Sequence, residues 1–389
     1  MNQGKYVFAQ LTDFLPRRIF DRIVHKHFGN KYVRTFTCWN QMLCMIFGQL
    51  TARDSMRDLI LSLEAHKSKY YHLGFGKTIS RRNLGIANEK RSSKIFEEFA
   101  YVLIDEARKS CYKNDFELEI DGNVYALDSS TIDLCLSVFW WAEFRKTKGG
   151  IKLHTLYDVK TSIPSFIHIS TASLHDVNVL DIIQYETGSF YVIDKAYIDF
   201  ERLYKLHCQG AYFVTRAKDN MRFKRMYSNS ADKKTGVLFD QIGKLEVYSS
   251  KKAYPEKLRR IKYYDKDNHK RFVFLTNNMD MEALEISYLY KKRWEVELFF
   301  KWMKQHLKIK SFWGTTLNAV KIQIYCAIIA YCLVAIIGNK LKVNRSIYEI
   351  LQILSISLLD KTPINEMLTK CDYKDVKELN YKQLKISGF

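Results

Sequence analysis

The pattern of apolar residues changes at Asp121, and this change limits the fold more than any other feature of the sequence. Before it, apolar residues recur every three to four positions, as in amphipathic helices. After it come short runs of β-branched and aromatic residues, such as Val124–Asp128 and Phe190–Asp194, which are typical of strands. A helical region followed by strands that alternate with helices predicts an α/β fold with a mixed sheet.

The same reasoning predicts the individual elements. Helices are expected in the N-terminal region at Leu15–His27, Thr37–Leu50, Ser55–Leu63 and Lys94–Ser110. Core strands are expected at Val124–Asp128, Gly150–Val159, Pro164–Thr171, Phe190–Asp194 and Ala211–Thr215, with a helix at Asp199–Gln209. Further strands are expected at Val237–Phe239, Lys244–Ser249, Leu258–Tyr264 and Arg271–Leu275. The last predicted helices are Met281–Ile309, Asn318–Gly338 and Ser346–Leu359.

These elements suggest a division of the chain into five segments. Residues 1–120 form a helical N-terminal region, and residues 121–223 form the first part of an α/β core. Residues 224–280 form a β-rich insertion, and residues 281–340 supply the closing helices of the core. Residues 341–389 form a helical C-terminal segment.

The charge balance requires an acidic partner. Lys and Arg number 62 against 42 Asp and Glu, which gives a formal net charge of +20. Nucleic acid and anionic membrane are the two obvious partners. The longest uncharged apolar run, Ile324–Ile337, has 14 residues, whereas a spanning helix needs about 20. It is therefore predicted to be a buried core helix, and no apolar signal segment begins the chain, so we expect a cytoplasmic protein without a membrane partner.

One face of the predicted helix Met281–Ile309 is polar and mostly basic. At 100° per residue its polar side chains fall within a stripe of about 80°. They are Tyr290, Arg293, Glu297, Lys301, Lys304 and Lys308. The neighbouring face is apolar and is predicted to be buried on the sheet; it carries Leu289, Val296, Phe300, Met303 and Leu307. A solvated face with ordinary ion pairs, such as Glu297–Lys301, would give the same stripe.

Two aspartates follow apolar strand residues. Asp128 ends one predicted strand and Asp194 ends another, where the sheet fixes the direction of a side chain. Together with a glutamate from a helix they would form an oxygen-rich site of the kind that Mg²⁺ or Mn²⁺ prefers. Two such ions about 3.5–4 Å apart can support phosphoryl transfer. For either aspartate alone, a turn or cap role is also consistent with the pattern.

The spacing on the long helix is more specific. The sequence Tyr290-x2-Arg293-x3-Glu297-x6-Lys304 resembles the Y-(2)-R-(3)-E-(6)-K motif of the family four insertion-sequence transposases, of the DDE class. Segments 127–131 (Leu-Asp-Ser-Ser-Thr) and 193–197 (Ile-Asp-Lys-Ala-Tyr) resemble the other two acidic blocks of that family. Ala196 stands where the family often has glycine. The resemblance covers about residues 120–315.

This resemblance implies an RNase H-like core in which Asp128, Asp194 and Glu297 bind two Mg²⁺ or Mn²⁺ ions. It also implies that Tyr290, Arg293 and Lys304 contact the phosphates of DNA near the cleaved end. Lys301 and Lys308 share their helix face and are expected to help. Arg216 and Lys218 follow a predicted strand, where a phosphate contact and a solvated strand end are equally consistent.

Other polar and aromatic residues are weaker candidates. A turn, cap or surface role is predicted for Asp121, Asp133, Asp158, Asp176 and Asp199. Lys152 and His154 share a strand face that could lie near the metal site, although an ordinary strand position is favoured. Stacking on DNA bases is considered for Trp140, Trp141 and Trp313, although a packing role is favoured.

The resemblance therefore implies a transposase that cuts its element's ends and joins them to target DNA. Its partner would be double-stranded DNA, both the terminal inverted repeats and the target, bound by the N-terminal helices as well as the core. A homodimer is expected in the active complex, since two ends must meet, in a nucleoid-associated bacterial setting. Two alternatives remain: an RNase H-like nuclease without strand transfer, and a DNA-binding protein derived from a transposase.

Overall fold

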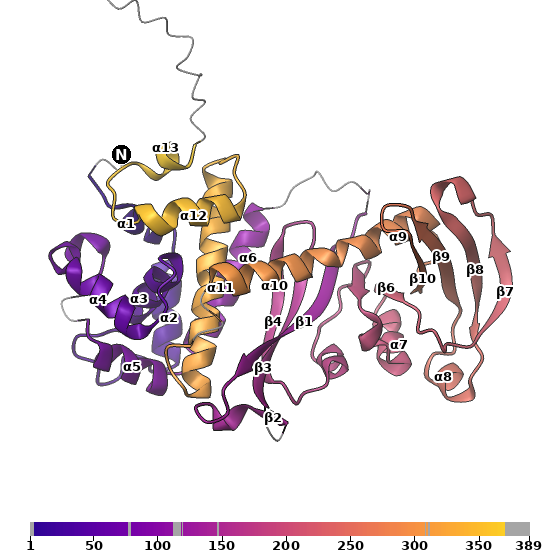
Figure 1. The fold of residues 1–389 in the computed structure, drawn as a ribbon, viewed down its shortest axis with the longest axis horizontal. Coiled ribbons are helices and arrows are strands. Elements are labelled where there is room, and N and C mark those ends of the chain that lie inside the picture. Colours follow the sequence, from indigo (N-terminus) through magenta and orange to yellow (C-terminus); the bar gives the residue numbers. More distant parts are fainter. Residues whose placement is uncertain are drawn as a thin grey trace, which may run out of the picture.

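The molecule is elongated, with a helical bundle at one end and antiparallel strands at the other (Figure 1). The computed structural model describes residues 4–76, 79–111, 118, 120–145, 148–307, 309 and 312–369. A ten-stranded sheet runs from beside the bundle to the far end. The two halves of the mixed α/β fold are therefore arranged in the order that the sequence predicts.

The N-terminal bundle contains all four predicted helices and two more. Its helices are α1 (Val7–Thr12), α2 (Arg17–Lys26), α3 (Cys38–Leu50), α4 (Met56–Ala65), α5 (Arg81–Lys90) and α6 (Lys94–Ser110). The Thr37 and Ser55 side chains cap α3 and α4 by accepting backbone N–H bonds, which fixes where these helices begin. The sequence missed α1, which has only six residues, and α5, which contains Gly85 and has few apolar positions.

The sheet is mixed and continuous. Its strands are β1 (Val124–Leu134), β2 (Glu143–Arg145), β3 (Lys148–Asp158), β4 (Ile163–Thr171), β5 (Phe190–Ile193), β6 (Tyr212–Arg216), β7 (Phe223–Asn229), β8 (Val237–Leu245), β9 (Leu258–Asp265) and β10 (Lys270–Thr276). Their order is β2-β3-β1-β5-β6-β10-β9-β8-β7, with β4 beside β3. The pairs β1–β5 and β5–β6 are parallel and the others antiparallel. Because β6 pairs with β10, the insertion extends the core sheet.

Two strand predictions were wrong in detail. The predicted strand Lys244–Ser249 is the end of β8 followed by a short helix, α8 (Tyr248–Ala253). Asp128 does not end its strand, because β1 continues to Leu134 in antiparallel pairing with β3. What ends near Asp128 is the parallel pairing with β5, whose last partners are Leu127 and Ile193.

Helix α7 (Phe200–Cys208) follows β5 as predicted. The Asp199 carboxylate accepts the Arg202 backbone N–H at 3.1 Å, so the predicted cap is confirmed. Four short 3₁₀ turns complete this part of the chain: η3 (Trp140–Ala142), η4 (Asp176–Asp181), η5 (Lys195–Tyr197) and η6 (Lys233–Thr235). Two more, η1 (Lys67–Lys69) and η2 (Tyr71–Leu73), lie in the N-terminal bundle.

The single helix predicted for Met281–Ile309 is two helices, α9 (Ala283–Lys292) and α10 (Trp294–His306). At the break, Arg293 N–H donates to Tyr290 O and Val296 N–H donates to Arg293 O, which are the tighter bonds of a 3₁₀ turn. Arg293 keeps right-handed helical backbone angles, so the helical periodicity continues through it. The predicted apolar face is confirmed, since Leu289, Val296, Phe300, Met303 and Leu307 are all buried.

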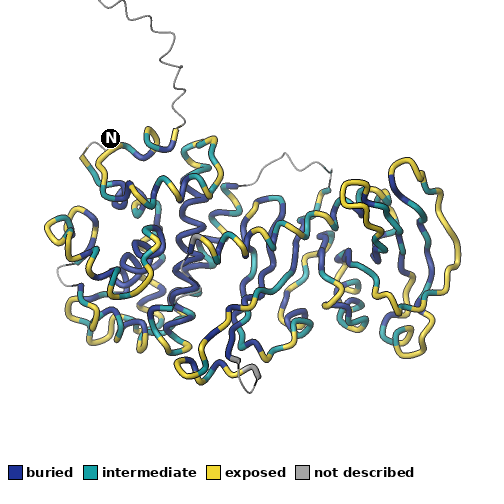
Figure 2. Tube along the Cα trace, viewed as in Figure 1, coloured by how far each residue is buried: buried dark blue, intermediate teal, exposed yellow. Residues whose placement is uncertain are grey.

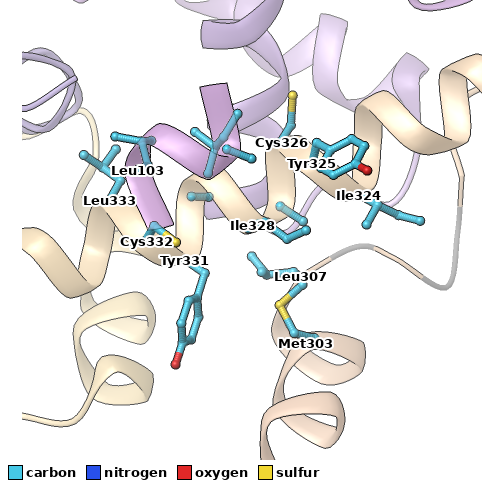
Figure 3. Packing of buried hydrophobic residues seen from close by; sticks show 14 of the residues in the cluster. Leu103, Met303, Leu307, Ile324, Tyr325, Cys326, Ile328, Tyr331, Cys332 and Leu333 are labelled. Carbon is cyan, nitrogen blue, oxygen red and sulfur yellow. The ribbon is translucent and has the colours of Figure 1, made fainter. Parts of the chain in front are cut away.

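Helix α11 (Leu317–Lys340) is the central core helix. It packs against α6 and α3, and Figure 3 shows its Ile324 and Ile328 near Met303 and Leu307. By length and composition it could span a membrane, yet 94% of its most apolar 18-residue window is buried inside the protein (Figure 2). Helices α12 (Ile347–Ser357) and α13 (Ile364–Leu368) follow, and part of the predicted C-terminal segment lies outside the described residues.

Candidate functional site

Two of the three candidate carboxylates lie side by side in the sheet. Leu127 and Ile193 are register partners in the parallel β1–β5 pair, and Asp128 and Asp194 directly follow them. Parallel pairing directs the two chains the same way, so both carboxylates leave the pair at one end. The Asp194 carboxylate accepts the Ala196 N–H at 3.0 Å, and this bond orients the aspartate at the start of η5.

The third carboxylate reaches the site through an arginine. The Arg293 guanidinium, at the break between α9 and α10, donates to Asp128 Oδ2 at 3.0 Å and also to Glu297 Oε1. All three side chains are half-buried, and α10 packs against β1 and β3. One cation therefore joins a carboxylate from the sheet to a carboxylate from the helix.

The electrostatics of this group are unbalanced towards negative charge. Burial raises the pKa of Asp128 to about 6, and the nearby Glu297 and Asp194 charges add to the rise. The Ser129 backbone N–H and the Arg293 guanidinium oppose it without cancelling it. A further cation would therefore stabilise the ionised form of Asp128.

The donor set fits a hard divalent cation, because all three side chains offer carboxylate oxygens. Within the described part of the chain, no three His, Cys, Asp or Glu residues are already close enough together to hold an ion. Arg293 instead pairs with two of the three candidates. Binding of a metal would require the guanidinium to give up at least part of these contacts.

The basic stripe of the helix lies beside this group. Lys304 Nζ donates to the Thr131 carbonyl of β1 at 2.8 Å, which holds the last turn of α10 over the strand that carries Asp128. The Tyr290 ring is half-buried against Phe274, and the Arg293 guanidinium lies 5.9 Å from its centre. Lys301 is exposed, and Lys308 lies outside the described residues.

A large cavity of about 1270 Å³ opens next to Arg293, between α9 and the β9–β10 strands. Its walls are basic and aromatic and include Arg216, Tyr290, Lys291, Arg293 and Trp294. Asp265 is the only acidic residue among the described side chains that line it. Arg216 therefore faces the same cavity as Tyr290 and Arg293 of the basic stripe.

The two strand-end cations that the sequence paired do not share a location. The Lys218 ammonium donates to the Ile198 carbonyl at 3.2 Å and lines a separate cavity of about 240 Å³. Arg216 instead lies over the Phe272 ring in the large cavity.

Asp176, which the sequence analysis assigned to an ordinary surface role, connects to the site. Its Oδ1 accepts the Ser129 hydroxyl at 2.7 Å and lies 3.1 Å from Lys152 Nζ and 3.8 Å from His154 Nδ1. Lys152 and His154 therefore lie near Asp128, because Asp176 connects them to Ser129, the residue that follows Asp128. Burial lowers the pKa of His154 to about 4, so it is neutral near pH 7. The sequence did carry a signal for this contact: Lys152 and His154 share one face of β3, and they pair with Thr131 and Ser129 of β1.

The remaining candidates have structural positions. Asp158 is buried in an ion pair with Arg108, while Asp121 and Asp133 are exposed. The Trp141 indole donates to the Thr315 carbonyl and Trp313 is buried, in agreement with the packing role favoured from the sequence. Trp140 differs, since 80% of its surface is exposed.

Comparison with known proteins gives two matches to protein families. Residues 120–333 match the family model of the transposase DDE domain, and residues 3–76 match a domain of unknown function, DUF4372. The first match covers every candidate site residue named above, from Asp128 to Lys308.

Three relatives are described as transposases. One from Sinorhizobium fredii, named y4zB, is 32% identical over 277 residues, which are 70% of this chain and 74% of that protein. One from Geobacillus stearothermophilus, for the insertion sequence element IS5377, is 30% identical over 57% of this chain and 58% of its own length. One from Synechocystis, for the element IS4SA, is 26% identical over 74% of this chain and 80% of its own length.

Proposed function

Since this chain belongs to the family of transposases with a DDE domain, and is thus an enzyme that acts on DNA, we propose that it cuts the ends of its own element and joins them to target DNA. The observation that carries the proposal is that Arg293 joins Asp128 to Glu297, while Asp194 follows the register partner of Leu127 beside Asp128. Family four of the insertion-sequence transposases is the subgroup that fits the spacing on α9 and α10.

An RNase H-like core is supported by the strand order. Three antiparallel strands, β4, β3 and β1, are followed by β5 and β6 in parallel with β1. We assign residues 121–223 and 281–340 to this core and residues 224–280 to its insertion. Residues 1–120 are proposed to bind DNA, and 341–389 form a C-terminal segment.

Asp128, Asp194 and Glu297 would hold divalent cations, Mg²⁺ or Mn²⁺, with two ions expected. When bound, such ions supply an activated oxygen nucleophile and stabilise the leaving oxygen. The protein's own residues do the positioning. Arg293 and Tyr290 present a cation and a phenol beside the carboxylates, and Lys304 is held over β1, so all three can orient DNA phosphates without reading sequence.

The reaction proceeds in two transfers. Water attacks a phosphodiester at the element's end, the P–O3′ bond breaks, and the 3′ oxygen leaves as a hydroxyl after taking up a proton. That 3′-hydroxyl then attacks a phosphodiester of the target, forms a new P–O bond and displaces the target's own 3′ oxygen. The first transfer hydrolyses a phosphodiester bond, and the second replaces one phosphodiester bond with another. No oxidant or energy source is therefore needed. A homodimer would bring the two ends together, and we place the reaction in the cytoplasm.

Asp128→Asn tests the site. It should abolish strand cleavage of duplex DNA that carries the element's end, because a neutral amide lacks the negative charge that the carboxylate offers a divalent cation, while duplex binding in the absence of divalent metal is retained. The matched control is Asp121→Asn, an exposed carboxylate a few residues before it in the chain. Cleavage that survives Asp128→Asn would exclude this site.

The two alternatives have distinct outcomes in the same assay. A nuclease without strand transfer would give cleaved ends but no product joined to a target plasmid. A DNA-binding protein derived from a transposase would bind the duplex and give neither product. Joined product that depends on Asp128 and on Mg²⁺ would favour the transposase mechanism over both.

A further inference from the structure

A second basic surface lies in the N-terminal bundle, in the region that matches a domain of unknown function. The loop from His27 to Phe36 faces α5 across a cavity of about 810 Å³. Among the described residues that line it, four are Lys or Arg and none is Asp or Glu. They are Lys31, Arg34, Lys90 and Arg91. We call this surface the α2–α3 loop groove.

The groove also exposes two aromatic side chains. Phe28 is 72% exposed and Tyr32 is 92% exposed, although both are large and partly apolar. Their backbone φ angles are +53° and +60°, in the left-handed region that bulky residues rarely adopt. Each such conformation costs about 1–3 kcal/mol and persists only where the surroundings impose it.

The surroundings hold the loop in this conformation. Gly29 N–H donates to the Val24 carbonyl at 2.9 Å, and Cys38 N–H donates to Asn30 Oδ1 at 2.8 Å. From the other wall, the Arg91 guanidinium donates to the Phe36 carbonyl and to Gln41 Oε1. These bonds tie both ends of the loop backbone that carries the rings and cations.

We propose that the α2–α3 loop groove is a duplex-DNA contact surface, separate from the catalytic site. Lys31, Arg34 and Lys90 would pair with phosphates, and the Phe28 and Tyr32 rings would pack on the sugars and bases beside them. The absence of carboxylates among the described lining residues favours a polyanion, and exposed rings next to cations suit nucleic acid because bases and sugars offer flat apolar faces. An anionic lipid surface would also attract the lysines and arginines, but it would give no role to the recessed groove between the loop and α5.

This inference deepens the proposed function and rests on it, since the DNA would be the same molecule that the catalytic site cleaves. The N-terminal bundle and the β9–β10 end of the sheet lie at opposite ends of the molecule, with α10 between them (Figure 1). The groove would therefore contact the duplex at a distance from the phosphodiester that the catalytic site cleaves. The groove would fix the position of the duplex, and the catalytic site would act on it.

The test measures binding of the full chain, without divalent metal, to a labelled duplex that carries the inverted repeat flanking the coding region. The double variant Lys31→Gln/Arg34→Gln should weaken binding at least about tenfold at 0.1 M salt. It should also lower the slope of log affinity against log salt by about two units. Lys67→Gln is the control, an exposed lysine of the same bundle outside the groove.

A second variant separates the rings from the charges and guards against misfolding. Phe28→Gly/Tyr32→Gly should weaken binding without changing the salt slope. Because glycine adopts positive φ freely, this variant should keep or raise the melting temperature. Unchanged affinity in both double variants would overturn the proposal. So would a loss of binding to anionic lipid vesicles with duplex binding intact.

Failure of the inference and failure of the proposed function can be told apart with Lys304→Ala in the same titration. If Lys304→Ala weakens duplex binding and the groove variants do not, the catalytic proposal survives and the groove proposal falls. If none of the variants changes binding, the groove proposal falls and Lys304 is not a phosphate contact, while the cleavage assay with Asp128→Asn decides the catalytic proposal separately.

Discussion

At the scale of single residues, Arg293 neutralises part of the charge of two candidate carboxylates. Its guanidinium contacts Asp128 and Glu297 at once, so it acts as a cation that the protein supplies to itself. The guanidinium only partly offsets the effect of burial and of the neighbouring Glu297 and Asp194, so the pKa of Asp128 stays raised. The same residue is a proposed phosphate ligand. DNA phosphate and the two carboxylates would therefore share its guanidinium, and a bound metal ion would share the carboxylates with it.

Arg293→Gln tests this sharing. Without metal, the variant should melt at a lower temperature, because Asp128 and Glu297 lose their common cation. Mn²⁺ should then raise the melting temperature more in the variant than in the natural protein, since the ion no longer competes with the guanidinium. Thermal unfolding with and without Mn²⁺ measures both effects.

Arg202→Gln provides the comparison, because Arg202 also joins two carboxylates, Asp181 and Asp199, away from the candidate site. Its response to Mn²⁺ should match that of the natural protein. An equal or smaller Mn²⁺ effect in Arg293→Gln would show that this arginine does not compete with metal.

At the scale of elements, the contact between α3 and the segment before α11 depends on a glycine. A Cβ on Gly48 would lie 2.3 Å from the Trp313 ring, which is buried and rigid. In an open helix, glycine to alanine gains up to about 1 kcal/mol, but overpacking a core costs about 1–3 kcal/mol.

Gly48→Ala should therefore lower the melting temperature. Gly85→Ala in α5 is the matched control, because its Cβ would meet only Met56 Sδ at 3.8 Å, and it should raise the melting temperature instead. Stabilisation by both substitutions would mean that Trp313 moves aside freely.

Elements whose signal is local could be predicted from the sequence. Helices α2, α3, α4 and α6 and the starts of the predicted apolar strand runs were located within a few residues, and the spacing of Tyr290, Arg293, Glu297 and Lys304 pointed to the region of the site. The break at Arg293 could not be predicted, because a 3₁₀ turn with helical backbone angles leaves the apolar periodicity intact. The contact of Asp176 with Ser129 also escaped, since it depends on how η4 packs back onto β1.

At the scale of the whole molecule, the insertion and the core share one sheet through the β6–β10 pair. A buried ion pair joins two strands of the insertion: Arg259 of β9 lies 2.8 Å from Asp240 of β8, with 5% and 3% of the two side chains exposed. Arg259 also donates to the Met279 carbonyl just before α9. Unfolding of the insertion should therefore disturb the core.

Asp240→Asn should lower stability by about 3–5 kcal/mol, because Arg259 would be left buried without its counter-charge. The loss should appear in a single thermal transition, and hydrogen exchange in β5 should rise along with that in β9. Glu201→Gln, which removes an exposed ion pair with Lys205, should cost at most about 1 kcal/mol. Two separate transitions, with only one of them shifted, would contradict a shared unfolding unit.

The break between α9 and α10 has a mechanical consequence. α9 packs on β5, β6, β8 and β9, whereas α10 packs on β1 and β3, so the two helices are anchored to different parts of the sheet. Arg293 is the joint between these two arms, and its side chain holds Asp128 and Glu297. A rotation of the insertion relative to β1 and β3 would move α9 relative to α10 and would therefore act at Arg293. If a bound duplex bends the protein here, the contacts of Arg293 with the two carboxylates would change with it.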